Sequence, residues 1–256
     1  MGAALPGDAR STVSGTQFHA LQGGRRIAFR FTPGAGPALV FLPGYMSDKA
    51  GSKAAAVFAW AATAGRACLL LDYSGCGESE GDFADGTLSR WRDEVLALID
   101  AKCTGPVVLI GSSMGGWLML LVALAMPERV AGLVGIAAAP DFTAWGFSDE
   151  QQAELLAGET VLEENAYGPQ PTPTYPGFWN DGQANLLLGQ SIPLDCPVRL
   201  LHGQCDTDVP WETALQLSEA LRSGDVQVTL VKDGDHRLSR DCDIALLLAV
   251  LAGLPK

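Results

Sequence analysis

Residues 109–120 have the sequence LIGSSMGGWLML, with two serines inside a glycine-rich turn and apolar residues on both sides. The apolar run before Gly111 predicts a buried strand, and MGGWLMLLVALAM predicts a helix that is apolar nearly all round. Residues 111–115 fit the pattern G-x-S-x-G, which places Ser113 rather than Ser112 on the turn between them. Such a turn strains the backbone at its serine, and glycines flank it because larger side chains would collide. The alternative interpretation is an ordinary turn of small residues.

Short apolar runs alternate with helical patterns on both sides of this turn. This alternation is typical of βαβ units, so we predict an α/β fold with a mostly parallel central sheet flanked by helices. The predicted strands are 26–31, 38–44, 67–75, 106–111, 129–140, 197–203 and 226–231. The predicted helices are 52–65, 87–102, 114–126, 211–221 and 241–251.

Residues 141–194 interrupt this alternation. They contain a short helical pattern around 151–162 and then a segment rich in proline and aromatic residues, 167–182. A segment of this length between two strands is predicted to lie over the sheet, and insertions of this kind often form lids. We therefore predict one domain, residues 1–256, with an inserted cap at about 141–194.

A serine hydroxyl becomes a useful nucleophile only when a base takes its proton. The chain has three histidines. His19 lies in a polar N-terminal stretch, and His202 ends a strand, where we expect a local hydrogen bond. His236 lies in the loop KDGDHRLS after the last strand, which can bring its imidazole over the sheet edge toward Ser113. His236 is therefore the predicted base.

The third member of a triad is a carboxylate that orients the imidazole. Asp206 follows the strand PVRLLHG at the same sheet edge and is the predicted acid. Asp208 fits better at the start of the next helix, and Asp72 fits better in a structural turn. Asp141 remains a rival, because it also follows a core strand. The chain order Ser113, Asp206, His236 is that of an α/β-hydrolase triad.

Two backbone N–H groups are predicted to bind the oxyanion. The first belongs to Met114, which follows the serine at a helix N-terminus. The second is expected in the loop LPGYMSD, residues 42–48, where Tyr45 is the candidate. The side chain of Tyr45 can also form part of the pocket wall.

Aromatic residues are concentrated in the predicted cap. The predicted substrate pocket is lined by Tyr45, Trp145, Phe147, Phe178 and Trp179, and Tyr167 and Tyr175 belong to the same group. The alternative is that the cap aromatics only fasten the cap to the body of the domain.

Charge and composition argue against several function classes. The formal net charge is -12, which disfavours nucleic acid and anionic membrane surfaces as partners. The six cysteines are spaced singly without metal-ligand spacing, as in proteins of reducing compartments. The first fifteen residues have no secretory signal, and no apolar run reaches membrane-spanning length. We expect a cytoplasmic protein with no membrane span, metal or organic cofactor.

Several segments together resemble one group of α/β hydrolases, that of alpha/beta-hydrolase domain-containing protein ten. They are FLPGYMSD, DYSGCGES, GSSMGGWLML, RLLHGQCDTDVPW and DHR. The resemblance runs from about Ala38 to the C-terminal helix and is weak in the cap. It implies an α/β-hydrolase fold, with Ser113, Asp206 and His236 as nucleophile, acid and base, and so favours Asp206 over Asp141. The group contains mitochondrial acyl-glucuronide esterases and palmitoyl-protein thioesterases, but neither specificity nor compartment carries over.

We therefore predict a serine-dependent carboxylesterase that hydrolyses small or medium acyl esters through an acyl-enzyme. One alternative is a thioesterase for acyl-CoA or S-acyl peptides. Peptidases, lactonases and carbon–carbon hydrolases use the same triad and stay open. A non-catalytic ligand receptor on this fold is less favoured, because such a protein has no need to keep the triad and the flanking glycines. The expected partner is a small-molecule ester or thioester.

Overall fold

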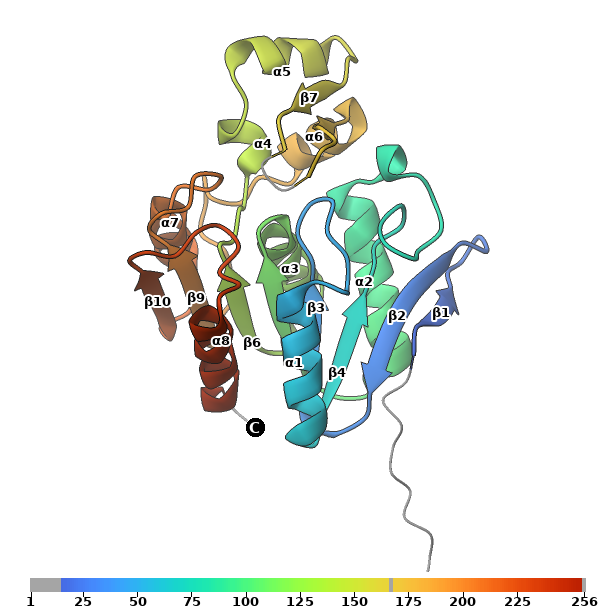
Figure 1. Ribbon diagram of the computed structural model, residues 1–256, viewed down its shortest axis with the longest axis vertical. Helices are drawn as coiled ribbons and strands as arrows, with labels where there is room; N and C mark the ends of the chain where they lie inside the picture. The colour runs from blue at the N-terminus through green and yellow to red at the C-terminus, as the bar shows by residue number, and fades with distance from the viewer. Residues whose placement is uncertain (1–14, 166–167, 255–256) are drawn as a thin grey trace, which may run out of the picture.

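The computed structural model describes residues 15–165 and 168–254, and an eight-stranded sheet forms its centre (Figure 1). The strand order is β1–β2–β4–β3–β5–β6–β9–β10. β2 is antiparallel to β1 and β4, and the other neighbours are parallel, which confirms the predicted sheet. The strands are Gln17–Ala20 (β1), Arg26–Thr32 (β2), Ala35–Leu42 (β3), Arg66–Leu71 (β4), Val107–Ser112 (β5), Val130–Ile136 (β6), Val198–Gly203 (β9) and Val226–Val231 (β10).

Helices cover both faces of this sheet. Two of them, α1 (Ser52–Thr63) and α8 (Asp241–Gly253), pack on one face. The other face is covered by α2 (Leu88–Lys102), α3 (Met114–Ala125) and α7 (Glu212–Ala220). Short 3-10 turns lie at Phe83–Asp85 and Pro127–Arg129. No helix within 15–165 or 168–254 is long and apolar enough to cross a membrane.

Local sequence signals explain where the helices and buried strands form. The hydroxyl of Thr87 accepts a hydrogen bond from the Arg90 N–H at 3.1 Å and caps α2, and such a cap contributes about 1 kcal/mol. Every residue of β4 and β5 is buried. Both faces of these strands are covered by helices, so they are continuous apolar runs rather than alternating ones.

Two predicted strands are shorter than expected. The strand predicted over 67–75 ends at Leu71, because the Asp72 carboxylate accepts hydrogen bonds from the Glu78 N–H and the Lys49 ammonium and folds the following residues into a turn. The strand predicted over 129–140 ends at Ile136. Ala137 follows with a φ of 45°, which an extended strand cannot accommodate.

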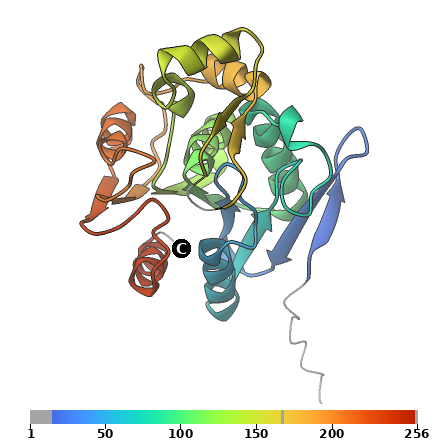
Figure 2. The same ribbon diagram turned by 45° about the horizontal axis from the view of Figure 1, so that its top comes forward.

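The inserted segment lies above the carboxyl ends of the parallel strands (Figures 1 and 2). The predicted helical pattern around 151–162 ends early, because Gly158 turns the chain with a φ of 87° before β7 begins. The segment rich in proline and aromatic residues contains both a strand and a helix, where Pro176 occupies the first helical turn. The elements are α4 (Phe142–Trp145), α5 (Asp149–Leu156), β7 (Val161–Glu163), β8 (Thr172–Thr174) and α6 (Pro176–Ala184).

Candidate active site

Ser113 stands on the turn between β5 and α3, with a φ of 55° and a ψ of -125°. This conformation is strained for a residue with a side chain, and it lifts the hydroxyl above the carboxyl edge of the sheet. The flanking glycines are required by close backbone approach. A Cβ on Gly111 would overlap the Gly115 carbonyl, and a Cβ on Gly115 would overlap the carbonyl oxygens of Leu42 and Pro43.

The variant Gly115→Ala is therefore expected to lower both stability and turnover. The added methyl group must push back the end of β3, which leads directly into the loop of Tyr45. We expect a loss of about 2 kcal/mol in the free energy of unfolding, a typical cost of overpacking. Urea unfolding monitored by circular dichroism measures this loss. Gly105→Ala is the matched control, because its Cβ meets nothing within 4 Å, and equal stability of the two variants would contradict this steric account.

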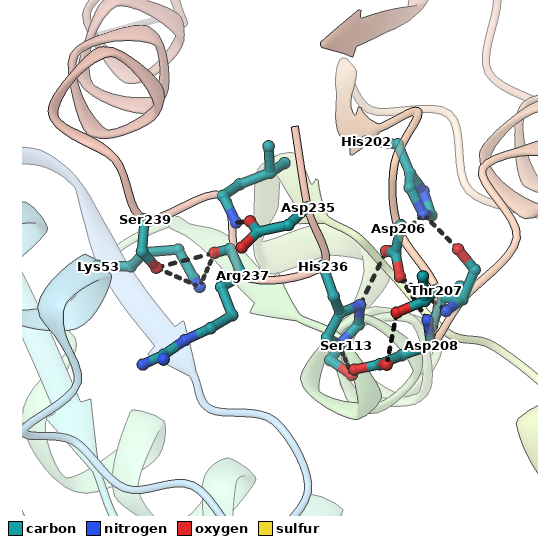
Figure 3. A network of polar contacts seen from close by, with 12 residues as sticks. Lys53, Ser113, His202, Asp206, Thr207, Asp208, Asp235, His236, Arg237 and Ser239 are labelled. Atoms are coloured by element: carbon teal, nitrogen blue, oxygen red, sulfur yellow. Dashed lines mark hydrogen bonds and ion pairs between the residues drawn. The ribbon is translucent and has the colours of Figure 1, made fainter. Parts of the chain in front are cut away.

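The structure brings the three predicted catalytic residues together (Figure 3). Oγ of Ser113 lies 3.0 Å from Nε2 of His236, and Nδ1 of His236 lies 2.8 Å from Oδ2 of Asp206. The three residues come from the β5–α3 turn, the loop after β10 and the loop after β9. The Asp206 side chain is fully buried, whereas that of His236 is 13% exposed. The hydroxyl can thus donate to Nε2 while Nδ1–H donates to the carboxylate.

Both oxygens of the Asp206 carboxylate have partners. Oδ1 accepts hydrogen bonds from the N–H groups of Asp208, at 2.9 Å, and Val209, at 2.8 Å. Oδ2 contacts His236 and also Nε2 of His202, at 3.1 Å. Burial alone would raise the pKa of Asp206, but hydrogen bonds from the two histidines outweigh burial and hold it well below the usual range. Asp206 is therefore a carboxylate at neutral pH.

Lys53 of α1 fastens the loop that carries His236 (Figure 3). Its ammonium group donates to the backbone carbonyl of Arg237 and lies 3.4 Å from the hydroxyl of Ser239. Burial, assisted by the charge of Arg237, lowers the pKa of Lys53 to about 8. No pattern in the sequence singled out Lys53, because its partners lie more than 180 positions further along the chain.

The rival carboxylates bind elsewhere. Asp141 accepts hydrogen bonds from the N–H groups of Leu187 and Leu188 at 2.7–2.9 Å, so it ties the start of the cap to its end. Asp72 pairs with the buried Lys49 ammonium at 2.6 Å and supports the loop that contains Tyr45. Neither carboxylate contacts His236 within the described part of the chain.

The two residues with the candidate oxyanion donors, Tyr45 and Met114, both line the cavity that contains Ser113. Met114 is the first residue of α3, so its N–H has no carbonyl one turn earlier in the helix to bond. Tyr45 lies in the loop after β3, and its hydroxyl donates to the Pro173 carbonyl of the cap at 2.9 Å. Its ring packs edge-on against Phe83. Burial raises the pKa of the Tyr45 phenol, so this hydroxyl is neutral.

A cavity of about 760 Å³ opens over Ser113 and His236. Of the predicted pocket residues, Tyr45, Trp145 and Phe147 line it, and Phe142, which the sequence analysis missed, lines it as well. This volume is within the range of small-molecule sites.

Phe178 and Trp179 do not line this cavity, contrary to expectation. Phe178 of the cap helix α6 is 1% exposed and packs against Tyr45 and Phe142. The indole N–H of Trp179 is turned inward and donates to the Thr143 carbonyl at 3.0 Å. Tyr175 lines a smaller neighbouring cavity of about 280 Å³, and Tyr167 lies outside the described residues.

In the residues that the structure describes, no group of three or more histidine, cysteine or acidic side chains could hold a metal ion. All six cysteines are unpaired.

A model of the alpha/beta hydrolase family matches residues 39–248. The chain belongs to the alpha/beta hydrolase family. It is 38% identical over 237 residues, 89% of this chain and 76% of the relative, to the human mitochondrial palmitoyl-protein thioesterase ABHD10. It superposes on mouse alpha/beta hydrolase domain-containing protein 10 with a TM-score of 0.87, at 37% identity over 93% of this chain and 97% of that one.

A protein of Agrobacterium vitis S4, named only as a hydrolase, also superposes with a TM-score of 0.87, at 39% identity over 93% of this chain and 98% of that one. Together with the family match, these similarities confirm the predicted α/β-hydrolase fold and the predicted class, a hydrolase of ester or thioester bonds.

The predicted cytoplasmic location is contradicted by this comparison, because the human, orangutan and mouse relatives are mitochondrial proteins. The prediction depended on unpaired cysteines and on the N-terminal residues. Unpaired cysteines indicate a reducing compartment but do not distinguish one such compartment from another. Residues 1–14 lie outside the described residues.

Proposed function

We propose that this chain hydrolyses acyl esters and acyl thioesters through a covalent intermediate on Ser113. The observation that carries the proposal is the contact of the Ser113 hydroxyl with His236, at 3.0 Å, on the floor of a cavity. His236 is the base, and Asp206 is the acid that orients it.

In the first half of the proposed reaction, Oγ of Ser113 attacks the acyl carbonyl while Nε2 of His236 takes its proton. Asp206 stabilises the imidazolium that forms, and it keeps the remaining proton of His236 on Nδ1. His236 then protonates the departing alcohol or thiol, and the acyl group stays on Ser113. In the second half, His236 activates a water molecule that releases the acid.

The backbone N–H groups of Tyr45 and Met114 bind the oxyanion in both halves of this mechanism. Each such donor contributes about 3 kcal/mol to the transition state. Support for Tyr45 comes from two anchors of its loop. The Tyr45 hydroxyl bonds the cap, and the neighbouring Lys49 ammonium is bonded to Asp72, so the loop is held before the substrate arrives.

Residues 141–194 form the cap of the single domain in this proposal and determine which acyl groups enter. The aromatic walls contributed by Tyr45, Phe142, Trp145 and Phe147 favour an apolar acyl group of small or medium size. The thioesterase candidate has separate support, because the human and mouse relatives are named palmitoyl-protein thioesterases.

Matched substrates distinguish the two candidates. We would compare p-nitrophenyl butyrate with a butyryl thioester of a simple thiol, and then lengthen the acyl chain in both series. Hydrolysis of both bonds at comparable kcat/KM is the expected result. A fluorophosphonate probe is expected to label Ser113 and to stop both activities together. Failure of the probe to react with the folded protein would instead support a non-catalytic receptor.

A further inference from the structure

A second histidine, His202, contacts the acid of the proposed triad. It lies in β9 with its side chain fully buried, and the Asp206 side chain is also fully buried. Nε2 of His202 is 3.1 Å from Oδ2 of Asp206, the same oxygen that Nδ1 of His236 approaches at 2.8 Å (Figure 3). From its place at the end of a strand, His202 is expected to make only a local hydrogen bond.

The surroundings of the His202 ring determine where its proton is. Nε2 faces two acceptors, Oδ2 of Asp206 and the backbone carbonyl of Val209, each at 3.1 Å. An acceptor nitrogen in that place would be repelled by both oxygens, so Nε2 carries a hydrogen. Nδ1 is buried and has no partner among the described residues, so a proton there would be left without an acceptor. The hydrogen on Nε2 is therefore directed at the Asp206 carboxylate and the Val209 carbonyl.

We propose that His202 is a positioning residue for the hydrolysis, which acts through Asp206 by donating Nε2–H to Oδ2. Its hydrogen bond, together with those from the Asp208 and Val209 N–H groups to Oδ1, leaves the carboxylate one orientation. In that orientation Oδ2 faces His236. The hydrogen bond from His202 also partly neutralises the negative charge on Oδ2, and so limits how strongly Asp206 stabilises the imidazolium form of His236. This inference rests on the proposed function.

Two substitutions of similar polarity separate this role from simple packing. The amide nitrogen of glutamine reaches about as far as Nε2 of histidine, so His202→Gln keeps a donor for Oδ2. The asparagine side chain is one carbon shorter than that of glutamine, so the amide nitrogen in His202→Asn does not reach Oδ2 of Asp206. We expect His202→Asn to lower kcat for p-nitrophenyl butyrate about tenfold, the effect of one lost hydrogen bond to a charged group, with KM unchanged. His202→Gln is expected to restore most of kcat.

The pH profile of kcat/KM provides the readout that packing alone would not move. Its acidic limb reports protonation of the essential base in the free enzyme. Loss of the donor leaves more negative charge on Oδ2 next to His236 and favours the imidazolium. The acidic limb of His202→Asn is therefore expected to move to higher pH, by about half a unit, and that of His202→Gln to stay near the wild type.

The other charged side chains around the cavity are the same in every variant, so their effect on the pH profile cancels when the variants are compared with the wild type. They are Lys53 of α1, Asp48 of the loop before it, Glu163 and Glu164 of the cap, Asp208 after β9, and Arg237 next to His236. Asp235, whose charge acts on Lys53, is also unchanged. His19→Asn is the matched control for loss of a histidine, because His19 lies in the edge strand β1 at the far side of the sheet. It is expected to leave both kcat and the pH profile unchanged.

The outcomes separate this inference from the proposed function. An unmoved acidic limb in His202→Asn, or an equal loss of kcat in His202→Gln and His202→Asn, overturns the role of His202 and leaves the triad untouched. Wild-type turnover in Ser113→Ala overturns the proposed function itself. Circular dichroism of each variant establishes that the comparison is between folded proteins.

Discussion

Ser113→Ala is expected to reduce kcat/KM for p-nitrophenyl butyrate by at least about 10⁴-fold, the usual cost of removing a triad nucleophile. The alanine lacks the oxygen that is proposed to form the acyl-enzyme, while the cavity and the proposed oxyanion donors remain. The measurement is steady-state release of p-nitrophenol by wild type and variant over a range of substrate concentrations. Stability is expected to change little, because the substitution removes one hydrogen bond and adds no atoms.

Ser112→Ala is the informative companion of this variant. The two serines are adjacent, but only Ser113 has the strained conformation and the contact with His236. We expect Ser112→Ala to be far less impaired than Ser113→Ala. The assignment of Ser113 as nucleophile would be wrong if Ser113→Ala kept wild-type turnover, or if Ser112→Ala proved the more damaging change.

Asp206→Asn is expected to lower kcat by about 10⁴-fold, as in other triads in which the acid becomes an amide. The asparagine has one acceptor oxygen where Asp206 has two. That oxygen is expected to take the place of Oδ1, which accepts hydrogen bonds from the N–H groups of Asp208 and Val209. Its NH₂ group would then face Nδ1 of His236. The ring would adopt the other tautomer, with a hydrogen on Nε2, and could not accept the proton of Ser113.

Asp141→Asn tests the rival acid by the same kinetic measurement. Its carboxylate accepts hydrogen bonds from the Leu187 and Leu188 N–H groups at the end of the cap. We therefore expect the free energy of unfolding to fall by about 1–2 kcal/mol, the usual cost of losing one buried hydrogen bond. We expect turnover to fall much less than in Asp206→Asn. A larger loss of kcat in Asp141→Asn than in Asp206→Asn would show that the wrong acid was chosen.

The sequence alone predicted those features that depend on neighbouring residues. Continuous apolar runs predicted the central strands, because a strand covered on both faces has no solvent side to alternate with. The glycines around Ser113 predicted its turn, because their missing side chains are a local steric requirement. The positions of Asp206 and His236 followed from one rule, that the carboxyl ends of parallel strands meet at the same edge of the sheet.

Contacts between segments distant along the chain were decided only by the tertiary structure. Aromatic composition could not tell that Phe178 and Trp179 of α6 are buried in the packing of the cap while Phe142 lines the cavity, because cap packing determines which side of a ring meets solvent. The hydrogen bond from Lys53 to the loop of His236 depends likewise on how α1 and the loop after β10 come together. His202, in contrast, contacts Asp206 only four positions further along the chain, as the expected local hydrogen bond does. Periodicity and turn chemistry act over a few residues, whereas the distant contacts arise only when the whole core has packed.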